Sequence, residues 1–278
     1  MQARTIKQMV SGRQTTDGAG VVLTRVLDNQ TTAQFDPFLM LDSFDSVNPE
    51  DYLPGFPTHP HRGIETITYL VSGSIAHQDS LGNRGVINAG DSQWMTAGSG
   101  ILHQEMPQPS SRMLGIQLWL NLRRTDKMKA PHYLTITKEM IPVAEEPEVR
   151  IHVISGTYRQ IKGITPLYLY TTILDIELHE QAVMELKTQR ETTCFVFSLE
   201  GSCLVDDQPV TKKTAVLLTH GDFVKLASVN NRPARILFFE APAIHEPIAW
   251  GGPIVMNTNQ ELQQAFAELR SGDFIRHR

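Results

Sequence analysis

Four side chains in the N-terminal half of the chain have the types and spacing needed to bind a transition metal. His59 and His61 are two residues apart, and so are His103 and Glu105. Side chains two apart on a strand project to the same face, so each pair can converge on one point. Three neutral imidazoles and a carboxylate suit Fe, Mn, Ni, Cu or Zn and are a poor match for Ca or Mg. We therefore predict a site for one transition-metal ion.

The fourth ligand has two candidates. Glu65 has the same parity as His59 and His61 and points to the same side if the strand stays regular. Gly63 lies between them, and a bulge there would reverse that parity. From spacing alone, Glu65 and Glu105 are equal candidates for the fourth ligand. Either carboxylate could also accept a substrate proton during catalysis.

The elements that must position these residues are strands. Short apolar runs rich in Val, Ile, Thr, Phe and Tyr alternate with Gly, Pro, Asn and Asp, as in ETITYLVSG (65–73), GIQLWLNL (115–122) and TCFVFSLEG (193–201). Turn residues at intervals of about 8–12 positions are typical of a β-sandwich or β-barrel. The pattern predicts an all-β fold.

One helix is expected near the C-terminus. Thr258 and Glu261 have the spacing of a capping box, in which each side chain satisfies a backbone N–H of the first turn. Leu262, Phe266 and Leu269 then form one apolar stripe. We expect a helix at about residues 259–270 that packs on a barrel.

A weak internal repeat indicates two similar β-units. Each copy has an apolar strand ending in Gly-Ser, a hairpin with an acidic turn, and a Gly-Asp that leads into another strand. The paired segments are residues 69–80 with 197–208, and residues 87–100 with 218–231. Two copies in one chain predict two barrels. We expect the boundary in the Pro- and Glu-rich stretch 141–149, giving domains 1–140 and 141–278.

The second copy lacks the metal-binding residues. The same intervals from its repeat glycines lead to Lys187 and Gln189 in place of the first histidine pair. They lead to Ala234 and Ile236 in place of His103 and Glu105. We therefore expect the second barrel to have no metal site and an apolar or solvent-filled interior.

Composition restricts the classes of partner and compartment. The net charge is −5 and there are only two cysteines. An acidic chain lacks the broad positive surface that attracts nucleic acid. Two cysteines are too few for a disulfide framework, which fits a reducing compartment. No secretory signal or membrane-spanning apolar stretch is visible, so we expect a cytoplasmic protein. A monomer is expected, because two barrels in one chain can cover each other's sheet edges.

The segments that contain the candidate metal ligands resemble the pirin family of bicupins. Bicupins are proteins with two cupin (double-stranded β-helix, or jelly-roll) barrels. The most specific segments are HPHRG followed by ET (59–66) and GSGILHQE (98–105). The others are PFLMLDSF (37–44), H-x-DSLGN (77–83), LWLNL (118–122) and EPIAWGGPIVMNTNQEL (246–262). Residues 123–245 resemble the family mainly in layout.

The resemblance implies a ligand set and a metal. Pirins bind one iron, here expected as Fe(II), in the N-terminal barrel through the two histidines of H-P-H and the His and Glu of H-x-E. This implies His59, His61, His103 and Glu105 as ligands and places Glu65 behind them. Zn, Ni, Mn or Cu can replace iron on purification, because affinity follows the general order of divalent metals.

The resemblance also implies two kinds of function. Some pirins resemble quercetin 2,3-dioxygenases, which open a flavonol ring with O₂ and release carbon monoxide. Others are regulatory proteins that bind transcription factors or metabolic enzymes, with the iron as a redox sensor. A cupin isomerase or sugar-binding protein is a third reading, because fold does not determine chemistry. In a dioxygenase, apolar side chains would line the cavity, with Phe38, Met40, Phe56, Met95, Met106 and Trp119 as candidates.

Overall fold

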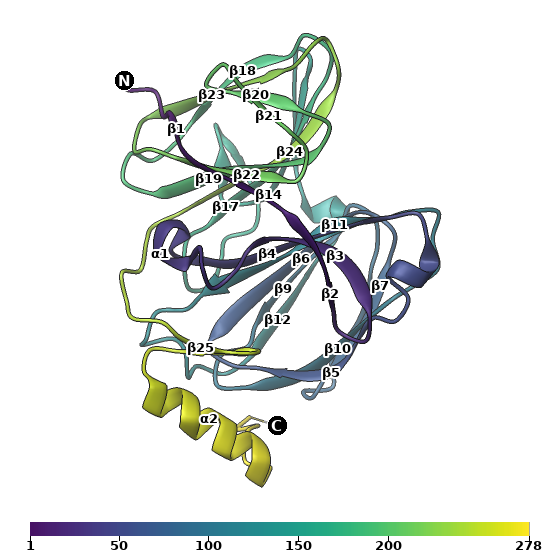
Figure 1. The fold of residues 1–278 in the computed structure, drawn as a ribbon, viewed down its shortest axis with the longest axis vertical. Helices are drawn as coiled ribbons and strands as arrows, with labels where there is room; N and C mark the ends of the chain where they lie inside the picture. The colour runs from purple at the N-terminus through teal and green to yellow at the C-terminus, as the bar shows by residue number, and fades with distance from the viewer. Residues whose placement is uncertain (278) are drawn as a thin grey trace. The chain divides into compact units, whose positions relative to one another are not determined.

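The computed structural model describes residues 1–277, which form two compact β-units with short helices. One unit comprises residues 14–138 and 244–278, the other residues 1–13 and 139–243. We call them the first and the second barrel. Each contains a seven-stranded and a four-stranded antiparallel sheet (Figure 1). The all-β prediction with two barrels is confirmed.

The first barrel encloses the predicted ligands. Its seven-stranded sheet has the order β12 (His132–Ile136), β9 (Ser92–Thr96), β6 (Ile64–Ser72), β11 (Met113–Asn121), β4 (Phe38–Ser46), β3 (Val21–Leu27) and β2 (Arg13–Asp17). Its four-stranded sheet has the order β5 (Phe56–His61), β10 (Ile101–Pro107), β7 (Ile75–Asp79) and β8 (Arg84–Ile87). The helix α1 (Thr32–Phe35) and the 3₁₀ turn η1 (Pro49–Asp51) lie in its connections.

The second barrel repeats this plan. Its seven-stranded sheet has the order β1 (Ile6–Ser11), β22 (Thr214–Leu218), β19 (Thr193–Glu200), β24 (Ala234–Ala241), β17 (Thr172–Leu178), β14 (Val149–Ser155) and β13 (Val143–Glu146). Its four-stranded sheet has the order β18 (Val183–Lys187), β23 (Phe223–Ser228), β20 (Cys203–Val205) and β21 (Gln208–Val210). The turn η2 (Lys138–Met140) and the small hairpin β15 (Thr157–Tyr158) and β16 (Ile161–Lys162) complete the described elements of this part.

The domain boundary differs from the prediction at both ends of the chain. A cut near residue 140 agrees with the division after Lys138. However, strand β1 pairs with β22 of the second barrel, and residues 244–278 belong to the first barrel. The division by contacts therefore differs from the predicted domains 1–140 and 141–278 at both termini. Each terminal segment thus belongs to the barrel formed mainly by the other half of the chain. A repeat in the sequence cannot reveal this, because the pairing partners of terminal strands are set by tertiary contacts.

The C-terminal segment adds a hairpin and a helix to the first barrel. Strands β25 (Ala249–Gly251) and β26 (Ile254–Met256) pair with each other, and α2 spans Asn259–Ser271 (Figure 1, yellow). The capping box between Thr258 and Glu261 is present, and Gly272 ends the helix in the left-handed conformation. The predicted helix is confirmed. None of the described helices is long and apolar enough to span a membrane.

Candidate metal centre

The three predicted histidines come together on two neighbouring strands. β5 and β10 are antiparallel, with His103 opposite His59 and Ile101 opposite His61. Side chains directly opposite each other project to the same face of a sheet. One ring nitrogen from each of His59, His61 and His103 lies within 4.8 Å of the other two. The three histidines thus lie together as the sequence predicts, and Glu105 is outside this group of ligand atoms.

Two of the imidazoles are oriented by backbone carbonyls. Nδ1 of His59 lies 2.9 Å from the carbonyl oxygen of Pro57, and Nδ1 of His61 lies 3.1 Å from that of Pro253. A carbonyl oxygen can only accept, so each Nδ1 carries the proton and each Nε2 keeps its lone pair. The two Nε2 atoms are 3.1 Å apart. Two basic nitrogens therefore face each other, as ligands of one cation do.

His103 supplies the third nitrogen. It is buried, and neither of its ring nitrogens has a hydrogen-bond partner within the described part of the chain. Burial, together with the neighbouring histidines, lowers the pKa of His103 well below its usual value. Burial and His59 likewise lower the pKa of His61 to about 3. Both rings are neutral near pH 7, which is the form that binds metals.

The arrangement fits a first-row metal ion. Two metal–nitrogen bonds of about 2.1 Å at about 90° place the nitrogens about 3.0 Å apart. The observed separation of 3.1 Å between the Nε2 atoms of His59 and His61 agrees with this value. A buried imidazole without a partner is costly unless something binds it. A bound metal ion would give a partner to a ring nitrogen of His103.

Glu105 lies on the same face of β10, where neutral donors hold its carboxylate. Thr68 Oγ1 donates to Oε1 at 3.1 Å, and Gln117 Nε2 donates to Oε2 at 2.8 Å. Among the described residues, its oxygens are not in the group of ligand atoms within 4.8 Å of one another. A carboxylate oxygen accepts more than one bond, so each oxygen retains capacity for a metal. A shift in the β5–β10 register between His103 and Glu105 accompanies this placement.

Glu65 faces the other side of the sheet. Strand β6 pairs regularly with β9 from Glu65 to Tyr69, so Glu65 and Thr68 point in opposite directions. Thr68 contacts Glu105, whereas the Glu65 carboxylate accepts from Thr96 at 2.6 Å. Of the two alternatives left open by the spacing, the structure has the interrupted strand, because β5 ends at His61 and β6 begins at Ile64. Burial raises the pKa of Glu65 to about 7.

Sequence reasoning missed a histidine beside this centre. His77 on β7 is directly opposite Glu105 on β10. Its Nδ1 lies 2.7 Å from the hydroxyl of Tyr133, and the two rings stack with centroids 4.9 Å apart. Burial lowers the pKa of His77. The segment H-x-DSLGN (77–83) begins with His77, but its spacing assigned His77 no role, and the β7–β10 register is what brings the residue here.

An apolar cluster forms one wall of the centre. Trp119 contacts His61 with ring centroids 4.9 Å apart, and Trp250 from the C-terminal hairpin lies 5.8 Å from Trp119. Met40 and Met95 belong to the same cluster. Of the six candidate lining residues, Phe56 packs instead on a separate cluster around Phe44.

The second barrel has apolar side chains at the corresponding positions. In the β18–β23 pair, Met184 is opposite Leu226 and Leu186 is opposite Val224. By sheet order and register, Met184, Leu186 and Leu226 replace His59, His61 and His103, and Ser228 replaces Glu105. The residues expected from glycine counting (Lys187, Gln189, Ala234 and Ile236) are therefore wrong, because the loops differ in length. The expected apolar interior is confirmed by a large cluster that includes Met184, Leu186 and Leu226.

A second group of ligand types in that barrel is an ion-pair network. His152, Asp175 and Glu177 lie within 4.8 Å of one another. Arg235 binds Asp175 through two nitrogens and is 3.3 Å from Glu177, while His152 Nε2 is 3.2 Å from Glu177. A guanidinium among the carboxylates neutralises them, so this group does not need a metal ion.

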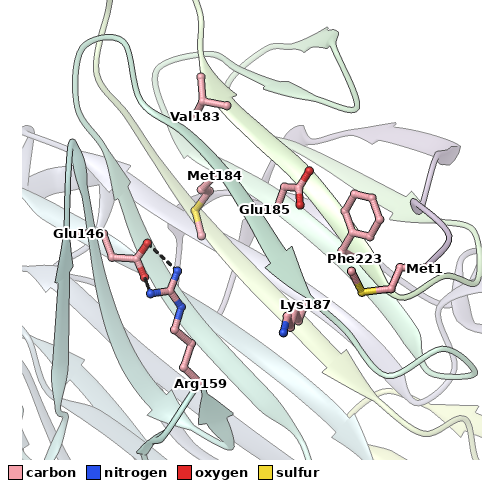
Figure 2. Close-up of a pocket in the computed structure, with 8 residues that line it drawn as sticks. All are labelled: Met1, Glu146, Arg159, Val183, Met184, Glu185, Lys187 and Phe223. Atoms are coloured by element: carbon pink, nitrogen blue, oxygen red, sulfur yellow. Dashed lines mark hydrogen bonds and ion pairs between the residues drawn. The ribbon is translucent and has the colours of Figure 1, made fainter.

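The second barrel also has a surface pocket of about 340 Å³ (Figure 2). Its charged lining residues are Glu146, Arg159, Glu185 and Lys187, and Arg159 is paired with Glu146. The apolar ones are Met1, Val183, Met184 and Phe223. No histidine or cysteine is among the described residues that line it. The cluster of three histidines lies in the first barrel.

Comparison with known proteins identifies the family of the chain. Residues 20–120 match the family model described as pirin, and residues 173–275 match that of the pirin C-terminal cupin domain. A pirin-like protein of Caulobacter vibrioides is 42% identical over 99% of this chain and 100% of its own length. Mouse pirin is 36% identical over 97% of this chain and 93% of its own length. A crystal structure of quercetin 2,3-dioxygenase from Acinetobacter baumannii superposes with a TM-score of 0.90, at 30% identity and 98% coverage of both chains.

Proposed function

This chain is a member of the pirin family, and we propose that it is a metal-dependent flavonol (quercetin) 2,3-dioxygenase. Its metal ligands would be His59, His61, His103 and Glu105. The observation that carries the proposal is the pair of facing Nε2 atoms 3.1 Å apart, next to the unpaired His103 and an aromatic wall. The structural neighbour named quercetin 2,3-dioxygenase supports the proposed reaction class.

A bound transition-metal ion would act as a Lewis acid for the substrate oxygens and bring O₂ chemistry to the site. The ion in the cell is proposed to be Fe(II). Zn, Ni, Mn or Cu would occupy the same donor set in protein purified from other hosts, because affinity follows the general divalent order.

The chain's own residues would bind the substrate and move its proton. Glu105 is the only candidate base of the predicted pair that faces the centre, since Glu65 points to the other side of β6. A carboxylate oxygen of Glu105 would accept the flavonol 3-hydroxyl proton. Thr68 and Gln117, which donate to this carboxylate, would hold it in position.

The apolar wall would select a flat substrate and exclude water. Trp119 and Trp250 present aromatic rings beside His61, and Met40 and Met95 fill the rest of the cluster. Stacking on such rings favours planar aromatic molecules. A water-poor cavity also strengthens the polar contacts made at the metal.

The test is a flavonol assay on metal-loaded protein. Apoprotein is loaded with Fe(II) without oxygen and then mixed with quercetin and air. Loss of quercetin absorbance, O₂ uptake and release of carbon monoxide are expected, and all three should disappear in His61→Ala. His132→Ala removes an exposed histidine from the same barrel and is the control. Loaded wild-type protein that leaves quercetin unchanged under air would eliminate the proposal.

The alternative is an iron-dependent, redox-sensing regulatory protein that binds a transcription factor or metabolic enzyme. One observation favours it: the carboxylate of Glu105 is already fixed by Thr68 and Gln117, which suits a site with four permanent protein ligands. A change in iron oxidation state would then alter the charge of a rigid site and shift partner affinity. Loaded protein in reduced and oxidised form should capture different partners; identical, partner-free profiles would contradict this function.

A further inference from the structure

His61 depends on a part of the chain that is remote in sequence. The carbonyl oxygen that orients its ring belongs to Pro253, 192 positions away. Pro253 lies in the turn between β25 and β26, where the Trp250 indole N–H donates to the carbonyl of Gly252. A backbone carbonyl has no rotamers. The His61 ring therefore keeps its orientation only while this turn stays in place.

The turn is attached to the segment that follows His61. The amide of Val255 donates to the carbonyl of Arg62 at 3.1 Å. A buried lysine, Lys127, donates to the carbonyls of Gly63 and Val255 and thus bridges the two segments. The backbones of the two segments approach each other closely at Gly63, because a Cβ there would lie 2.0 Å from the Val255 carbonyl oxygen. Glycine is required here both for this contact and for its φ of +78°.

Arg62 attaches the helix as well. Its side chain is only 2% exposed and donates to Glu268 on α2 at 2.7 Å and to the carbonyl of Phe274 at 2.8 Å. The guanidinium also lies over the Phe274 ring, 4.2 Å from its centroid. Burial alone would raise the pKa of Glu268, but hydrogen bonds from Gln264, Arg62 and Arg276 lower it to about 2.

The Arg and Gly of H-P-H-R-G thus hold the C-terminal segment, whereas the two histidines face the metal site. Trp250 adds an aromatic contact, because it packs on Trp119, which in turn packs on His61. A metal-binding imidazole donates its second ring N–H to a group that orients it, and loss of that acceptor commonly weakens metal affinity about 10- to 100-fold.

We propose that residues 250–274 form a clamp that positions His61 for metal binding, with the Arg62–Glu268 ion pair as its anchor. This inference rests on the proposed metal centre and assigns positioning roles to Arg62, Gly63 and Glu268. Loosening the clamp frees the His61 ring to rotate, and the site then loses a preorganised ligand. Metal affinity falls while the fold of the barrel remains.

The test compares two glutamates of the same helix. Glu268→Ala removes the anchor, and Glu268→Gln keeps a hydrogen-bonding group of the same size. Glu261→Gln is the matched control, since Glu261 caps α2 and pairs with exposed Arg124 but does not touch Arg62. For each protein we would measure Ni(II) affinity by chelator competition, the visible spectrum of the Co(II)-loaded form, and the melting temperature.

The expected result is about a 10-fold weaker Ni(II) affinity and an altered Co(II) spectrum in Glu268→Ala, with partial rescue in Glu268→Gln. Glu261→Gln should lower the melting temperature and leave both metal readouts unchanged. Equal Ni(II) affinity and equal spectra in folded Glu268→Ala and in wild type would overturn the clamp alone; if Glu268→Ala does not fold, wild-type values in Glu268→Gln would do so. Wild-type protein that binds neither ion would overturn the metal centre itself, and the clamp with it. These readouts do not depend on flavonol turnover.

Discussion

Replacing His103 with leucine separates the metal role of this residue from its effect on stability. His103 is buried and both ring nitrogens lack a hydrogen-bond partner among the described residues. A buried polar group without a partner costs about 1–3 kcal/mol. Leucine is close to histidine in size and carries no polar atom. We therefore expect His103→Leu to make the metal-free first barrel more stable by about 1–3 kcal/mol.

Metal binding should make wild type more stable than His103→Leu, which reverses the order expected for the metal-free proteins. Binding stabilises the folded state by about 2.7 kcal/mol when free metal is 100 times the dissociation constant. Wild type gains this stabilisation, whereas His103→Leu has lost a ligand and gains nothing. For a unit of this size, about 1 kcal/mol changes the melting temperature by roughly 2–4 °C.

The assay is differential scanning calorimetry of apoprotein and Ni(II)-loaded protein, with the transition of each barrel fitted separately. His132→Leu, at an exposed position on β12, controls for the general effect of the substitution. A metal-free His103→Leu protein less stable than wild type would show that the imidazole is satisfied by the protein. The lack of hydrogen-bond partners at His103 would then no longer indicate a metal ligand.

Three further predictions concern the C-terminal segment. Gly63→Ala should destabilise the first barrel by about 2–5 kcal/mol in urea unfolding, because its Cβ would lie 2.0 Å from the Val255 carbonyl oxygen at a positive φ; an effect below 1 kcal/mol would refute the close contact. Thr258→Ala should cost about 1 kcal/mol and reduce helical ellipticity, since it removes one half of the capping box. The pKa of Glu268 is lowered to about 2, so the unfolded chain binds more protons between about pH 4.5 and pH 2. The advantage of wild type over Glu268→Gln in urea unfolding should therefore be constant above pH 5 and decrease as the pH falls through this window; a difference that does not change with pH would contradict it.

The sequence by itself determined the fold class, the capped helix and three of the site residues. Alternation of apolar side chains has a period of two whatever the tertiary fold, so runs such as 65–73 indicate strands directly. The same period places His59 with His61 and His103 with Glu105 on one face each. The capping box of Thr258 and Glu261 is equally local. Signals of this kind survive because the residues that produce them are neighbours in the chain.

Only the tertiary structure showed the features that depend on strand register and on pairing between distant segments. The break between His61 and Ile64 turned Glu65 away from the centre, and glycine counting could not give the register of the second barrel. The β7–β10 pairing brought in His77. The exchange of terminal segments placed the Pro253 carbonyl beside His61, across 192 positions. Local spacing cannot predict such contacts, because they depend on how many strands pair with one another in the complete fold.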